Sequence, residues 1–400
     1  MQQIHLRKRR LSQFALRFFE GQVSQLPDCA SHSIHGSTSS PRTEDLIGTS
    51  LIIKTKSIHK ELRSALAITL GISALLGSVD VLACAACGCT LSKDWESQGI
   101  SSQPGFTADV SYDYLDQNKQ RYGTGTASPT LINNQLAAGQ EVEAYTRTQT
   151  VTASLIYNED TWGVGVMLPY VMRSHGTYGT TAPLGSSYAS SADASIGDLR
   201  VVGRYTGLSS ERTSGIIAGI KLPTGSTNKN FDAGTAAGTP LDAGLQIGTG
   251  STDIILGAYT TGTIDTYGWF LQGTVQHAVA TRQALGNLDY RPGDAYLLNT
   301  GIRYAGFGAK VSPMLQLNVI RRQADSGAPD ALGNRSVPID PVTGVPVSGG
   351  TLAYLAPGVS VRVGGGASVY GFVQIPIYQN VNSLQLTPGY TLTMGVRQSF

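Results

Sequence analysis

The sequence predicts an all-β fold, a transmembrane antiparallel up-and-down β-barrel of about twelve strands. Three observations lead to this prediction. Residues 105–400 alternate between apolar and polar side chains, the connections between the alternating segments are long and short in turn, and the chain ends on an aromatic residue, Phe400. Although 400 residues would ordinarily suggest two or three soluble domains, we expect a single barrel over 105–400.

The composition suits a wall with one apolar face and one mildly polar face. Charged residues make up 14% of the chain, against about 25% in an average soluble protein, and the hydrophobic fraction of 41% is not raised to compensate. Tyrosine outnumbers phenylalanine by 18 to 9, which suits rings that keep one end in water. The net charge of +2 gives no reason to expect a nucleic-acid partner.

The alternating segments have the period of two that is typical of strands between lipid and a lumen. Outer-membrane lipid is therefore the expected surrounding, and an even strand number agrees with single-chain bacterial barrels. The expected strands are 105–116, 142–157, 161–172, 197–207, 213–222, 251–261, 265–280, 294–305, 308–321, 351–363, 367–379 and 389–400.

The connections fall into two classes that follow one another in turn. Outer-membrane barrels have long outer loops and short periplasmic turns, so this pattern places both ends of the barrel segment on the periplasmic side. The long connections are 117–141, 173–196, 223–250 and 322–350, with 281–293 intermediate and 380–388 returning; the short ones are 158–160, 208–212, 262–264, 306–307 and 364–366.

The last expected strand carries an assembly signal. Tyr390, Met394 and Val396 share one parity with Phe400, whereas Gln398 stands where this pattern would have an apolar residue. A terminal ring after alternating apolar residues resembles the segment by which outer-membrane barrels are recognised. We therefore expect the barrel-assembly machinery as a partner and Phe400 as the assembly signal.

Charged residues in the expected strands fall mostly on the parity that faces the lumen. A charge on the lipid face near the midplane would cost about 2–4 kcal/mol, so a polar lumen is the consistent arrangement. We expect most of these charges to form ion pairs that fill the lumen. The expected lumen-lining residues are Asp109, Asp113, Asp198, Arg200, Arg204, Lys221, Arg303, Arg362 and Arg397.

The first part of the chain reads as an export signal that follows a leader. Lys54 and Lys56 begin a basic region, 64–76 is apolar, and small residues follow up to Ala85, so 54–85 is the expected signal peptide. Residues 1–53 are interpreted as a misassigned start or an extended leader, with a functional basic arm as the alternative. Residues 86–104 form the expected N-terminal periplasmic segment.

Cys84, Cys87 and Cys89 lie around the expected cleavage point. Three interpretations stay open. Cleavage before Cys84 gives a lipidated N-terminus, thiolates at this spacing bind a soft metal such as Cu(I) or zinc, or two of the cysteines form a redox pair within the processing region.

Four segments are similar to one bacterial family, the outer-membrane proteins associated with the meta-pathway of phenol degradation, grouped with FadL-like transporters. The resemblance covers roughly 153–400 and implies a barrel that passes small, often hydrophobic or aromatic molecules. The segments are GDLRVVGRY at 197–205, GIKLPTGS at 219–226, GTGSTDIILGAY at 248–259 and YRPGDAYLLNTGIRY at 290–304.

The sequence offers little for an enzyme built on a barrel. Beyond the expected signal, the histidines are His175 and His277, and neither has a nucleophile motif or paired carboxylates beside it. We expect no catalysis and no cofactor. Two functions remain: a channel or transporter for small solutes in the outer membrane, and a structural or surface-interaction barrel with a metal-binding or lipidated N-terminus.

Overall fold

The computed structural model describes residues 104–400 except 139, 180–186, 285–287, 309, 329–330, 332–335 and 341–342. The expected leader, the signal peptide, the three cysteines and nearly all of the expected periplasmic segment lie outside these residues. None of the helices within the described ranges combines the length and the apolar character that a membrane span requires.

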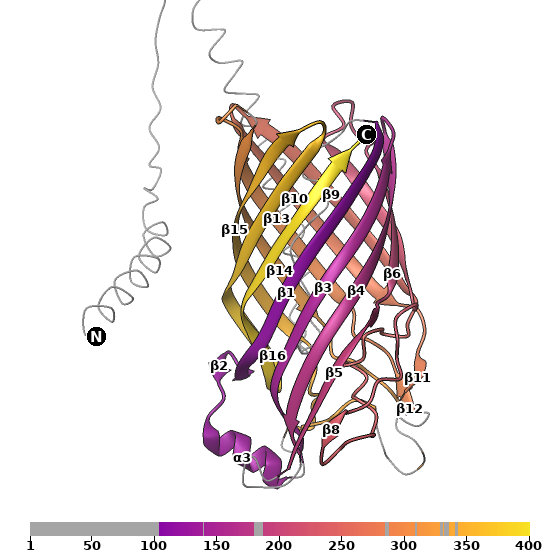
Figure 1. Ribbon diagram of the computed structural model, residues 1–400, viewed down its shortest axis with the longest axis vertical. Helices are drawn as coiled ribbons and strands as arrows, with labels where there is room; N and C mark the ends of the chain where they lie inside the picture. Colours follow the sequence, from indigo (N-terminus) through magenta and orange to yellow (C-terminus); the bar gives the residue numbers. More distant parts are fainter. Residues whose placement is uncertain are drawn as a thin grey trace, which may run out of the picture. The chain divides into compact units, whose positions relative to one another are not determined.

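The strands form one closed antiparallel barrel (Figure 1). β1 (Gly105–Gly123) closes it, because it pairs with β3 (Val142–Asn158) on one side and with β16 (Ala367–Ser399) on the other. Between them the wall runs through β4 (Trp162–Tyr178), β6 (Leu199–Tyr205), β7 (Ser214–Leu222), β9 (Asp253–Ile264), β10 (Tyr267–Ala278), β13 (Ala295–Tyr304), β14 (Val311–Arg322) and β15 (Gly350–Gly364). The predicted all-β barrel is confirmed.

β16 contributes two successive passes to the barrel wall. Its first half pairs with β15 and its second half with β1, both antiparallel. The backbone N–H of Ser399 donates to the carbonyl of Gly366 at 3.1 Å, so the element ends beside the turn from which it started. The chain reverses near Ser383, whose φ is 36°. Eleven strands thus give twelve passes, and the loop expected over 380–388 is instead strand on both sides of the reversal.

The pleat separates the two faces of the wall. In β1, Thr107, Asp109 and Ser111 are buried, whereas Phe106 and Val110, on the opposite parity, are half-exposed. The other strands repeat this arrangement, so the outer surface is a continuous apolar band. Its members include Val166, Leu168, Ile216, Leu256, Ile302, Val369, Val373 and Val396.

Two of the expected loops contain wall strands instead. β1 continues to Gly123, β4 continues to Tyr178, and β5 (Tyr188–Ile196) pairs with the extension of β4. The region after β1 also holds the short strand β2 (Gly125–Thr126) and a helix, α3 (Pro129–Ala137), which Ser128 caps by accepting from the N–H of Leu131. These segments lack the ten-residue alternation of a membrane strand, and extension of the ladder beyond the membrane decides their structure.

The long connections gather at one end of the barrel, together with β8 (Ala233–Gly234), β11 (Arg282–Ala284) and β12 (Leu288–Tyr290) (Figure 1). The loop between β7 and β9 packs closely there. Leu241 and Leu245 are buried against Phe231 and against Ala189 of β5, and Ala243 is buried with Tyr290 and Val337. Apolar side chains therefore fix these loops as a cap, which we call the loop cap (residues 223–252 and the loops that pack on them).

The end of the chain closes the opposite rim. The backbone N–H of Phe400 donates to the carbonyl of Phe106 at 2.9 Å, and the Phe400 ring is 77% exposed. The side chain of Gln398 donates to the carbonyl of Gly365 at 2.7 Å, which gives a reason for an amide at a position of apolar parity.

We expect deletion of Phe400 to lower the yield of assembled barrel severalfold, and more than Gln398→Val does. The Phe400 ring belongs to the apolar parity of the closing strand, whereas the Gln398 side chain makes a hydrogen bond to a single turn, at Gly365. The folded and unfolded bands on unboiled gels measure the yield. Equal yields from the two variants would contradict the assembly role of Phe400.

Candidate functional site in the polar interior of the barrel

The inward side chains of β1 and of the second half of β16 form a buried polar strip. Asp109 and Arg397 face one another in the register of the two strands. The hydroxyl of Tyr370 donates to Asp109 at 3.0 Å, and the hydroxyl of Thr393 donates to Asp113 at 2.7 Å. Three of the expected residues, Asp109, Asp113 and Arg397, therefore lie together, and all three are buried.

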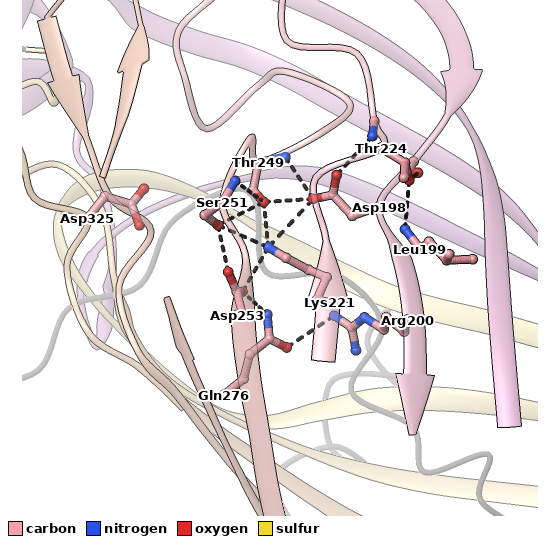
Figure 2. Close-up of polar contacts among 12 residues, drawn as sticks. Asp198, Leu199, Arg200, Lys221, Thr224, Thr249, Ser251, Asp253, Gln276 and Asp325 are labelled. Carbon is pink, nitrogen blue, oxygen red and sulfur yellow. Dashed lines mark hydrogen bonds and ion pairs between the residues drawn. The ribbon is translucent and has the colours of Figure 1, made fainter. Parts of the chain in front are cut away.

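Lys221 at the end of β7 is the centre of a second network (Figure 2). Only 2% of Lys221 is exposed. Its ammonium lies 2.8 Å from Oδ2 of Asp253 and 3.5 Å from Oδ2 of Asp198, and it donates to the hydroxyl of Ser251 at 3.2 Å. The three charged residues come from β7, from the start of β9 and from the junction of β5 with β6, so the network joins neighbouring strands.

Arg200 is linked to this network through a neutral amide, that of Gln276. Its guanidinium donates to Oε1 of Gln276 at 3.2 Å, and Gln276 in turn donates to Asp253. The two buried carboxylates, Asp198 and Asp253, thus share Lys221, and the exposed side chain of Arg200 is linked to Asp253 through Gln276. Buried charges are tolerated when they are paired and hydrogen-bonded in this way.

Asp198 also holds both ends of the loop between β7 and β9. Its Oδ1 accepts the backbone N–H of Gly225 at 3.0 Å, and its Oδ2 accepts the backbone N–H of Thr249 at 2.9 Å and the Thr249 hydroxyl at 2.7 Å (Figure 2). The carboxylate therefore anchors the loop cap to the wall. The network connects the barrel interior to the loops at this end of the barrel.

The remaining expected residues are dispersed. Arg204 donates to the amide oxygen of Asn158, and Arg303 lies against Gly268, where a Cβ would meet the Arg303 side chain at 2.5 Å. Arg362 is exposed near the turn before β16. The nine expected residues are thus distributed over several places in the wall.

Several interior residues are not among those expected, and one of them, Asp253, is charged. Asp253 is 2% exposed and is the closest ion-pair partner of Lys221. On the other side of the barrel, Asn299 donates to Asn318 at 2.7 Å and Asn318 donates to Gln374 at 3.3 Å. The strand parity that placed Arg303 inward also places Asn299 inward, but neutral amides give no signal in a search for charges.

The two histidines lie apart. His175 is fully buried in β4, and its Nδ1 lies 2.8 Å from the hydroxyl of Thr146. His277 in β10 lies 2.9 Å from the carboxylate of Asp294 and 3.1 Å from the guanidinium of Arg291. The two histidines therefore lie in different parts of the fold, and each interacts with residues close to it.

The sequence matches no protein-family model and no curated protein. Solved structures do match. An outer-membrane channel from Pseudomonas putida F1 has a TM-score of 0.53 at 10% identity, over 78% of this chain and 99% of that one. The toluene transporter TbuX from Ralstonia pickettii (TM-score 0.37, 12% identity, 74% and 90% covered) and a FadL homologue from Pseudomonas aeruginosa (0.36, 12%, 80% and 99%) are more distant. The first match shows that the fold is that of an outer-membrane barrel.

Proposed function

We propose that the chain is an outer-membrane channel for small, weakly polar or aromatic molecules. The observation that carries the proposal is a closed barrel with an apolar outer band and a polar interior in which acids and bases are paired, such as Lys221 with Asp253 at 2.8 Å. The fold match to an outer-membrane channel supports the location, and the resemblance to the phenol-pathway family supports the solute class.

The charge pattern argues against an ion-selective pore. Such pores use a ring of charges of one sign. Here Asp109 faces Arg397, and Asp198 and Asp253 share Lys221. A field of mixed sign favours neither cations nor anions, so selectivity rests on size and on the loop cap.

A structural barrel is the second candidate, because part of the interior is filled by side chains. Tyr354 packs with Leu352 and Ile320, and Phe372 packs with Tyr370 and Met314, all of them buried. A filled lumen would hold the wall rigid without passing solute. The two candidates differ in conductance.

Purified, refolded protein in planar bilayers and in liposomes tests the proposal. We expect small conductance steps without strong ion selectivity, and liposome uptake of benzyl alcohol above that of a disaccharide. Empty liposomes and liposomes with heat-denatured protein are the controls. The absence of both conductance and uptake from intact protein and from a variant with a shortened cap would favour the structural barrel.

A further inference from the structure

A cavity of about 90 Å³ lies among the outer loops, apart from the Lys221 network. Its wall includes four carboxylates, those of Glu141, Glu143, Asp242 and Asp325, of which Asp325 is paired with Arg322 at 3.6 Å. Within the described residues, neither Glu143 nor Asp242 has an ion-pair partner within 4.0 Å, and Oε1 of Glu141 lies 4.0 Å from Nε2 of His175. Glu141, Glu143 and Asp242 therefore form a group of carboxyl side chains that have few ion-pair partners among the described residues.

Unsatisfied acceptor atoms accompany these charges. Gln385, which is 5% exposed and lines the cavity, donates through Nε2 to the carbonyl of Asn382 at 2.7 Å, but its Oε1 has no partner among the described residues. Oε2 of Glu143 is buried and likewise has no partner there. Buried acceptors without donors are costly, so the cavity suits a ligand that brings N–H donors.

The basic side chains beside the cavity, those of Arg173 and His175, already form hydrogen bonds to other groups. Arg173 donates to the carbonyls of Leu245 and Gln246 at 2.9 and 3.0 Å, and to the hydroxyl of Thr148 at 3.1 Å. His175 holds Thr146 through Nδ1. Burial and the charges of Glu141 and Glu143 raise the pKa of Asp242 to about 7, with His175 acting in the opposite direction. The crowding of acids shows that a further positive charge would be stabilising.

We propose that this cavity binds a small organic ammonium ion, with N–H donors directed to Glu143, Asp242 and Gln385. Leu245, Val337 and the ring of Tyr290 supply an apolar wall for a short hydrocarbon part. In the described part of the chain, no group of three or more His, Cys, Asp or Glu residues fits a metal ion, which favours a hydrogen-bonding cation over a metal. Occupancy of the cavity is independent of whether any solute crosses the barrel.

Titration of the intact barrel in detergent with ethylammonium chloride, followed by saturation-transfer NMR, tests the site. A ligand of three non-hydrogen atoms cannot bind much more tightly than about 1 mM, so we expect half-saturation in that range. Ethanol has the same size and no charge, and sodium chloride controls for ionic strength. Equal binding of ethanol and ethylammonium, or displacement of ethylammonium by calcium at lower concentration, would overturn the proposal.

Two variants identify the place of binding. We expect Asp242→Asn to weaken binding about tenfold, which corresponds to the loss of one charge-assisted hydrogen bond. Glu211→Gln makes the same kind of change in the β6–β7 turn and should leave the affinity unaltered. Gln385→Leu removes a hydrogen-bond acceptor without changing the charge. Weaker binding of ethylammonium by this variant would indicate a specific hydrogen-bonding site and not a general electrostatic attraction. If Asp242→Asn binds like Glu211→Gln while both run as folded barrels on unboiled gels, the site is not this cavity.

Two further measurements constrain the ligand. Because the ionised form of Asp242 receives the cation, and its pKa is about 7, affinity should increase up to about tenfold from pH 6 to pH 8. An affinity that decreases as pH rises contradicts this assignment. Glycyl-lysine amide tests whether the bound ammonium group belongs to a peptide. If this probe binds more tightly than ethylammonium, the ligand is the ammonium group of a peptide and not a free amine.

Discussion

Replacement of Lys221 by Met is expected to lower the free energy of unfolding by about 3–5 kcal/mol. The ammonium lies 2.8 Å from Asp253 and 3.5 Å from Asp198, and both carboxylates are buried. Removal of the cation leaves two buried negative charges that share only hydroxyl, amide and backbone donors. Loss of one partner of a buried pair costs far more than the net contribution of the pair, because the remaining charge cannot regain its hydration.

Urea unfolding of the refolded barrel in liposomes measures this effect. Lys119→Met is the matched control, since Lys119 is an exposed lysine of β1 and its loss should change stability by less than about 1 kcal/mol. The double variant Lys221→Met with Asp253→Asn should recover part of the loss, because one of the two unpaired carboxylates is then neutral. A Lys221→Met barrel as stable as the Lys119→Met barrel would show that water already reaches the network.

Shortening the loop between β7 and β9 is expected to raise solute flux severalfold. Replacement of residues 227–247 by three glycine and serine residues removes Leu241 and Leu245, which fix the cap against Phe231 and Ala189. Gly225 and Thr249, the two ends that Asp198 holds, remain. The wall should therefore stay intact while its mouth opens.

Single-channel conductance and liposome uptake of benzyl alcohol measure the change. Replacement of only residues 235–239, the mostly exposed tip of the same loop, is the matched control and should leave flux unaltered. A rise in flux from both variants would indicate general damage to the barrel. Unchanged conductance in the 227–247 variant, with a folded band on unboiled gels, would mean that the lumen itself is the barrier.

The sequence alone determines the barrel wall. The alternation of Val110 and Asp109, or of Val396 and Arg397, is a local property with a period of two, and each strand carries it independently of its neighbours. The short turns are likewise local, as at Gly365 and Gly366, where φ is positive. These features sufficed to predict the fold class, twelve passes and most strand positions.

The tertiary structure alone decides which inward residues meet. Lys221 contacts Asp198 and Asp253 because the register between β6, β7 and β9 brings three positions that are distant in the sequence to the same level along the barrel axis. This register is set by strand pairing over the whole barrel. The loops have no period, so the burial of Leu241 and the acidic cavity around Asp242 follow only from how one loop packs on another. Alternation of apolar and polar residues determines which face of the wall each side chain occupies. Closure of the barrel and packing of its loops determine which side chains come into contact.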